Sequence, residues 1–174
     1  VNRPEVSAYR LALHLFVGLV ILLALLTVGL GLLRRPAATA TQGAAARRLR
    51  GFAGALVILV LVTVVAGAFT AGLDAGLTYN TFPLMDGRWI PEGYLMLDPW
   101  WRNLFENVAT VQFDHRVLGL TTGLAAIVFC VLSLREPLPR KARVAACHVG
   151  VLALVQPALG IATLLEVVPP PLAL

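Results

Sequence analysis

The sequence predicts an all-α integral membrane protein: a bundle of four transmembrane helices with a structured outer loop that contains a short interfacial helix. Three observations carry this prediction. The 174 residues are 59% hydrophobic and only 13% charged, with a mean hydropathy of +0.84, whereas about 25% of the residues of a soluble domain are charged. Four apolar segments are each long enough to cross a bilayer, which takes about 20 residues of helix. Basic residues are concentrated between these segments. The composition excludes both a water-soluble globule and a disordered chain.

The predicted spans cover residues 9–33, 51–72, 108–134 and 144–165. The connections 34–50 and 135–143 are rich in Arg and Lys, so the positive-inside rule makes both of them cytoplasmic. The connection 73–107 carries five acidic residues but only two basic ones, and we therefore expect it on the periplasmic side of a bacterial inner membrane. The net charge of +5 is thus an orientation signal, and we expect no nucleic-acid partner.

The outer loop 73–107 holds all three tryptophans, Trp89, Trp100 and Trp101. Tryptophans at this level are typical of a membrane-anchoring belt, and a lid over a site is the alternative. The pair Asp98-Pro99 is a helix-start signal, with Asp98 as the cap. A helix from there to residue 134 would have 36 residues and measure about 54 Å. We therefore predict an interfacial helix over residues 100–105, bent relative to the third span.

Two histidines, His14 and His115, lie inside predicted spans, where an ionisable residue is a functional hypothesis by default. Each of them lies 20 residues before a cytoplasmic arginine, so both rings are expected at one depth near the outer face. Each also has a glycine four residues further on, which leaves space on the same helix face. The arginines and glycines in question are Arg34 and Gly18 for His14, and Arg135 and Gly119 for His115.

A neutral imidazole beside a cleared helix face is what an axial haem ligand requires. The alternative is that each histidine hydrogen-bonds across a helix interface and that the glycines serve packing alone. A zinc site is disfavoured, because no further ligand residue stands at the right spacing. Arg116 follows His115 directly and would either pair with a haem propionate or extend to water.

Other polar and sulfur-containing residues in the spans are assigned structural roles. His148 lies near the cytoplasmic side and is interpreted as an interfacial or packing residue. Cys130 and Cys147 have neither metal-type spacing nor a disulfide framework and are interpreted as small buried residues. The pair Gln156-Pro157 predicts a kink and an interhelical hydrogen bond in the fourth span.

Four stretches of the sequence resemble one family. They are 67–87 (GAFTAGLDAGLTYNTFPLMDG), 99–116 (PWWRNLFENVATVQFDHR), 9–14 and 159–165. Together they are similar to haem A synthase of the alphaproteobacterial and mitochondrial type. The resemblance implies eight transmembrane helices in two four-helix halves, of which this chain matches helices four to seven. Residues 1–50 would then be the last helix of the N-terminal half with its basic linker, and 51–174 three helices of the C-terminal half.

The resemblance also implies a reaction: a methyl group of haem O is oxidised to the formyl group of haem A for cytochrome c oxidase, by a protein that holds haem b. His115 resembles the axial ligand of the haem b iron and His14 that of the substrate-haem iron, with Arg116 near a propionate. The partners implied are the lipid bilayer, haem O, haem O synthase and an electron donor. Tyr79 and Asn80 would line the site or an electron-donor entrance, or simply form a turn.

The family's proposed catalytic glutamate and the second histidine of each pair have no counterpart in these residues. The predicted topology also places Val1 and Leu174 on the outer side, and the chain opens without Met. We therefore expect a part of a longer enzyme, inactive by itself. The alternatives are a b-type cytochrome subunit for electron transfer and a haem-binding assembly protein without catalysis.

Overall fold

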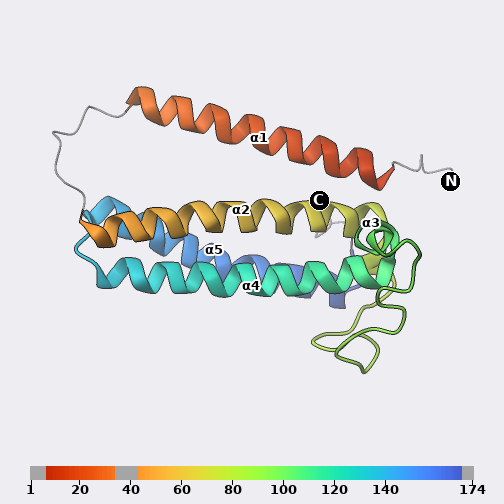
Figure 1. Ribbon diagram of the computed structural model, residues 1–174. Coiled ribbons are helices and arrows are strands. Elements are labelled where there is room, and N and C mark those ends of the chain that lie inside the picture. Colours follow the sequence, from red (N-terminus) through yellow and green to blue (C-terminus); the bar gives the residue numbers. More distant parts are fainter. Residues whose placement is uncertain (1–6, 34–42, 170–174) are drawn as a thin grey trace.

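The computed structural model describes residues 7–33 and 43–169, and the regular structure of these two ranges is helical apart from one isolated bridge between Met85 and Arg88. Four long helices alternate in direction along the bundle: α1 (Ala8–Leu33), α2 (Ala44–Gly72), α4 (Val108–Arg135) and α5 (Arg140–Leu165) (Figure 1). All four are long and apolar enough to cross a membrane. The predicted four-span helical bundle is confirmed.

The helix α2 begins earlier than the predicted span. The apolar pattern placed the start at Gly51, whereas the helix starts at Ala44 and includes Arg47, Arg48 and Arg50. Alanine and arginine are both strong helix formers, so the helix continues past the apolar segment into the basic connection. The predicted boundary at residue 50 between two halves of the chain therefore lies inside a continuous helix.

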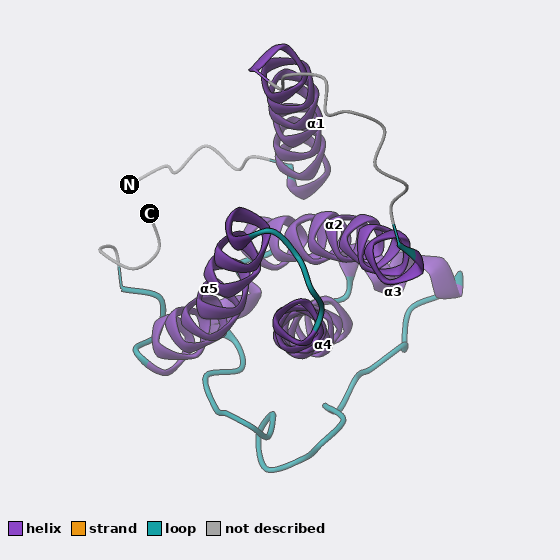
Figure 2. Ribbon diagram, turned by 90° about the vertical axis from the view of Figure 1, so that its left-hand side faces the viewer, coloured by secondary structure: helices purple, strands orange, loops and turns teal. Residues whose placement is uncertain are grey.

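Helices α2, α4 and α5 pack together, and α1 lies beside α2 on the side away from α4 (Figure 2). Small residues allow the close approaches. A Cβ added at Gly123 of α4 would lie 3.3 Å from the carbonyl oxygen of Ala153 on α5. Between α2 and α4, the hydroxyls of Thr63 and Thr122 hydrogen-bond at 2.7 Å. Close backbone contact and hydroxyl bonds of this kind are the usual means of joining helices in lipid.

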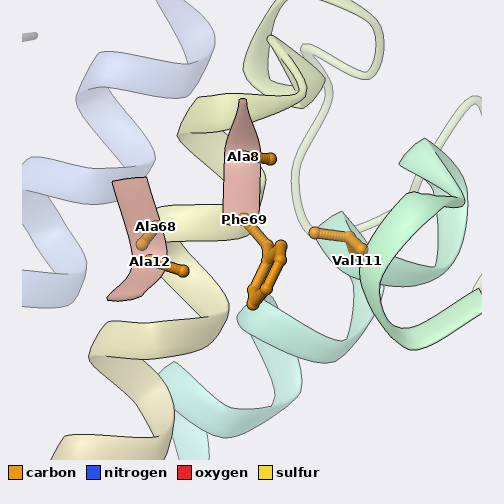
Figure 3. Packing of buried hydrophobic residues seen from close by; sticks show 5 residues of the cluster. All are labelled: Ala8, Ala12, Ala68, Phe69 and Val111. Atoms are coloured by element: carbon orange, nitrogen blue, oxygen red, sulfur yellow. The ribbon is translucent and has the colours of Figure 1, made fainter. Parts of the chain in front are cut away.

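The helix α1 joins the bundle at its outer end. Ala8 lies against Gly72, where an added Cβ would come within 2.7 Å of the Ala8 Cα. Figure 3 shows the apolar cluster there, in which Ala8 and Ala12 face side chains of α2 and α4. The Tyr9 hydroxyl donates to Glu106 at 2.8 Å. Beyond this end α1 diverges from α2 (Figure 1), and most of its apolar side chains are exposed.

The outer loop contains three short helical pieces: η1 (Ala75–Leu77), η2 (Trp100–Arg102) and α3 (Asn103–Glu106). The chain bends at Asn107, which is extended, and whose side chain accepts a hydrogen bond from the Thr110 amide at 3.2 Å. The predicted interfacial helix, bent relative to the third span, is confirmed. The predicted cap Asp98 is wrong: Pro99 is the N-cap of η2 and no side chain caps that turn. The capping side chain is needed at the bend, because the long helix starts there with unpaired amides.

Asn103 organises the loop around it. Its side chain is completely buried, and it bonds both backbone groups of Leu97, the Trp100 carbonyl and the Asn107 side chain at 2.8–2.9 Å. Around this fixed centre the tryptophans remain outside, with Trp89 75% and Trp100 68% exposed. The loop is therefore a defined structure that presents indole rings at the outer end of the bundle.

Candidate functional site

His115 lies seven residues after the start of α4, and its ring packs against the α2 backbone. A Cβ added at Gly67 would lie 2.9 Å from the His115 Cε1 and 3.4 Å from each ring nitrogen. Among the residues that the structure describes, the buried Nδ1 has no hydrogen-bond partner. Buried polar atoms are normally paired, so this nitrogen has unused capacity for a ligand.

The face of α4 that carries His115 holds further unpaired polar atoms. Gln112 and Arg116 lie three residues before and one residue after it, with Gly119 one turn beyond. Gln112 Oε1 and Arg116 Nε are buried without partners. No atom lies within 4 Å of a Cβ built on Gly119. Gln112 and Gly119 thus share the His115 side of α4, and Arg116 lies about 100° further around the helix.

Arg116 and Gln112 connect this face to the outer loop. Arg116 donates through Nη1 to the Thr81 carbonyl at 2.8 Å and through Nη2 to the Tyr79 carbonyl at 2.9 Å. Gln112 Nε2 donates to the same Tyr79 carbonyl at 3.0 Å. The terminal nitrogens of the guanidinium group therefore each bond a loop carbonyl, and Nε is the donor with spare capacity.

Tyr79 and Asn80 make contacts typical of loop architecture. The Tyr79 hydroxyl donates to the Glu92 carbonyl at 3.3 Å. The Asn80 amide donates to the Gly76 carbonyl and, at 3.1 Å, to the Leu164 carbonyl at the end of α5. These bonds attach the first part of the outer loop to α5 and favour the structural interpretation of both residues.

His14 occupies the matching level on α1, six residues after the helix starts. It is exposed, and Gly18, one turn further on, also has no atom within 4 Å of a Cβ position. Because α2 lies between α1 and α4 (Figure 2), the structure places His14 and His115 at one end of the bundle but in separate positions. His14 and His115 thus lie six and seven residues from the starts of two helices that meet at this end.

Asp114, on the other side of His115, faces the loop residue Tyr94. The Tyr94 hydroxyl donates to Asp114 Oδ1 at 3.3 Å, and its ring meets Phe113 edge-on at a centroid distance of 5.1 Å. Burial, and then the nearby Asp114 carboxylate, raises the pKa of the Tyr94 hydroxyl above its ordinary value. Tyr94 therefore stays protonated and serves as a donor at neutral pH.

The opposite end of the bundle has a different character. His148 is exposed there, with Nδ1 2.8 Å from the Val144 carbonyl, and it borders a shallow groove with Arg140 and Lys141. This placement fits the interfacial role expected for it. Within residues 7–33 and 43–169, no group of three or more His, Cys, Asp and Glu side chains is placed to hold a metal ion.

Two residues of the site, Gly67 and Gln112, were not identified from the sequence as site residues. Gly67 opens the stretch 67–87 used for the family resemblance, but its contact with His115 depends on how α2 and α4 pack. Gln112 is only 2% exposed. A polar residue in a span, one turn before an intramembrane histidine, is the signal by which the sequence could have identified it.

The fold and this site define a multi-span helical membrane protein with single histidines at one level of two spans. The comparisons agree: the family model described as cytochrome oxidase assembly protein matches residues 1–174, and the chain belongs to that family. The sequence resemblance is thereby confirmed. No solved structure matches the chain.

Among curated relatives, the chain is 50% identical over 170 residues to heme A synthase COX15 of Bos taurus, with 98% of this chain and 41% of the relative covered. It is 44% identical over 173 residues to heme A synthase of Nitrosospira multiformis, with 99% and 48% covered. For heme A synthase of Mesorhizobium japonicum the identity is 45% over 175 residues, with 100% and 47% covered. The chain thus spans less than half the length of these relatives.

Proposed function

We propose that these residues belong to a haem A synthase, a membrane oxidoreductase that oxidises a methyl group of haem O to the formyl group of haem A for cytochrome oxidase. The names of relatives that match almost the whole chain at 44–50% identity support this reaction. The family description as cytochrome oxidase assembly protein supports the pathway. Each relative is more than twice as long as the matched region, so the proposal concerns the whole protein.

The observation that carries the proposal is the environment of His115. A haem ligand needs a neutral imidazole with one free nitrogen, a second interaction that fixes the ring plane, and space for a flat molecule. Among the described residues Nδ1 is buried and unpaired, the α2 backbone at Gly67 lies against the ring, and Gly119 leaves the adjoining helix turn clear. The residues present fit an axial ligand for haem b.

The neighbours of His115 have positioning roles in this proposal. When bound, the haem supplies the redox chemistry, while the protein supplies ligation, orientation and electrostatics. Gln112 and Arg116 hold the loop carbonyls of Tyr79 and Thr81 over the outer end of α4. Arg116 Nε, buried and unpaired, is the donor that would face a propionate.

His14 is proposed as the axial ligand of the substrate haem. Its level in the bundle, its exposure on α1 and the clear helix turn at Gly18 support this role. Because α2 lies between α1 and α4, the two histidines serve two different haems in this proposal. The partner ligand of each iron, and the catalytic glutamate expected from the family resemblance, would come from the remainder of the protein.

The proposed orientation places the outer loop 73–107 on the periplasmic side of the inner membrane and the basic segments 34–50 and 135–143 in the cytoplasm. The charge asymmetry of these connections supports it, as do the exposed tryptophans of the loop. Both proposed haem positions then lie near the periplasmic face. Haem O synthase and an electron donor are the partners that this reaction requires.

The test uses the full-length protein purified from membranes, with the variants H115A, H14A and H148A. We expect H115A to lose the Soret absorption of bound haem b. H14A is expected to keep this absorption but to leave haem O unconverted, measured by chromatography of extracted haems. H148A is the matched control, because its ring lies at the other end of the bundle, and it should behave as wild type.

Two results would replace the proposal with its alternatives. A wild-type protein that binds haem b but never converts haem O, even with reductant and oxygen, would be a b-type cytochrome subunit or an assembly protein. An H115A variant with an unchanged haem spectrum would remove His115 from the site.

A further inference from the structure

The interface between α4 and α5 is a seam of small side chains in the half of the bundle away from His115. Buried small residues of this half of the bundle are Ala126 on α4, which is 4% exposed, Ser133 on α4, which is 1% exposed, and Ala146 on α5, which is 3% exposed. Gly150 of α5 also lies in the seam, and the Cβ and Sγ atoms of Cys130 each approach its Cβ position to 3.0 Å. The two helices therefore come close enough for short side chains to meet.

The register of the seam places the two cysteines opposite each other. Gly123 of α4 faces Ala153 of α5. Cys130 lies seven residues, or two turns, further along α4, and in an antiparallel pair two turns back along α5 from Ala153 reaches residues 146–147. Cys147 also lies three residues before Gly150, on the same face of α5. The chain thus brings one thiol from each helix to the same point.

The state of the sulfur atoms agrees with this register. Both cysteines are free thiols of intermediate exposure, and they lie close enough to interact electrostatically. Cys130 lies 15 residues from His115 along α4, a distance of about 22 Å. The thiol pair is therefore separate from the candidate haem site, and no role assigned above uses it.

We propose that Cys130 and Cys147 form a redox-active dithiol that closes into a disulfide between α4 and α5 when it meets a membrane-soluble two-electron acceptor of the quinone class. One pair of thiols reduces one quinone molecule. Each thiol gives up one proton and one electron, one S–S bond forms, and the quinone takes both protons and both electrons to become the quinol. A strong thiol reductant reverses the step and frees both helices.

The location suits an oxidant of this class. Cys130 lies five residues before the end of α4 and Cys147 seven residues after the start of α5, about 8 and 11 Å from the helix ends. This depth lies within the apolar part of the span, where a quinone partitions. Adjacent helices that approach through Gly and Ala meet the short Cα separation that a disulfide needs.

The experiment treats the full-length protein in liposomes with decyl-ubiquinone, blocks the remaining thiols under denaturing conditions and digests with trypsin. Cleavage in the basic connection separates the peptide that contains Cys130 from the one that contains Cys147. We expect the two peptides to be recovered as one linked species, lighter by two hydrogen atoms, and to separate after reduction. C130S and C147S should leave the other cysteine as a free thiol.

The matched control is the double variant C147S/V149C. It keeps the number of thiols and nearly the same depth, but it moves one thiol by about 200° around α5, away from the seam. Val149 is exposed, so the substitution is tolerated. We expect wild type to form the linked species about tenfold more than this variant, because the Cα separation and direction now exclude a bridge.

Three outcomes would overturn the proposal. Both cysteines could remain free after treatment with quinone, the control variant could link as readily as wild type, or the link could join peptides of different molecules in a mixture of isotopically light and heavy protein. Linking within one molecule, lost in both single variants and in the control, supports it.

Discussion

Replacing Gly67 by alanine tests whether the α2 backbone seats the His115 ring. The added Cβ would lie 2.9 Å from Cε1 and 3.4 Å from both ring nitrogens, so the ring or α2 must shift. Overpacking of this kind costs about 1–3 kcal/mol. Alanine also favours a helix over glycine by about 1 kcal/mol, which offsets part of the cost. Measured alone, the variant would therefore mix two opposing effects.

The variant G54A separates them. Gly54 lies on the same helix, and no atom lies within 4 Å of its Cβ position, so only the helix propensity changes there. We expect G67A to be less stable than G54A by about 1–3 kcal/mol, the steric contribution by itself. The assay is unfolding of the purified full-length protein in detergent, with bound haem followed by its Soret band.

The double variant G67A/H115A completes the test. With the ring removed, the additional methyl group fits, so the destabilisation by G67A should shrink by most of its value in the H115A background. We also expect G67A to shift or weaken the Soret band, and G54A to leave it unchanged. Equal stability and equal spectra for G67A and G54A would refute the reasoning that Gly67 positions His115.

Three further variants test other contacts. N103A should destabilise the outer loop by about 2–4 kcal/mol, because Asn103 is fully buried and makes four hydrogen bonds; protease resistance of the loop measures this, and unchanged resistance would contradict it. The hydrogen bond from Tyr9, and then Arg102, lowers the pKa of Glu106. The ionised Glu106 carboxylate therefore stabilises the protein above its ordinary pKa of about 4.5, and this stabilisation is lost as the pH falls through the lowered pKa. E106Q should abolish this contribution to the pH dependence of the melting temperature. T122V removes a hydroxyl bond to Thr63 and should cost about 1 kcal/mol in unfolding, whereas a neutral effect would show that the hydroxyl pair is not stabilising.

The helical architecture was predictable because a lipid bilayer restricts the secondary structures that can span it. A span must satisfy its own backbone hydrogen bonds, so length and hydropathy alone located four helices within a few residues. The bend at Asn107 was also predictable, since an unbroken helix would have been too long for one span. The start of α2 at Ala44 was missed because hydropathy marks the membrane core and not the helix end.

The side-chain contacts across helices were not predictable from spacing. The sequence predicts His14 and His115 at one level, yet nothing in either segment indicates that α2 lies between their helices. Arg116 is one example: its bonds to Tyr79 and Thr81 join positions 35 and 37 residues apart, and these depend on the path of the loop. The meeting of Cys130 and Cys147 depends in the same way on the α4–α5 register.

Because α1 is attached to the bundle at its outer end, a tilt of this helix would move its two ends by different distances. Its buried apolar cluster and its hydrogen bond to the outer loop lie at Ala8–Ala12, and the helix of 26 residues is about 39 Å long. A tilt of about 10° around that end would carry Leu33 through about 7 Å but His14, about 9 Å from the pivot, through less than 2 Å. The histidine therefore keeps its place while the far end of the helix follows whatever packs against it.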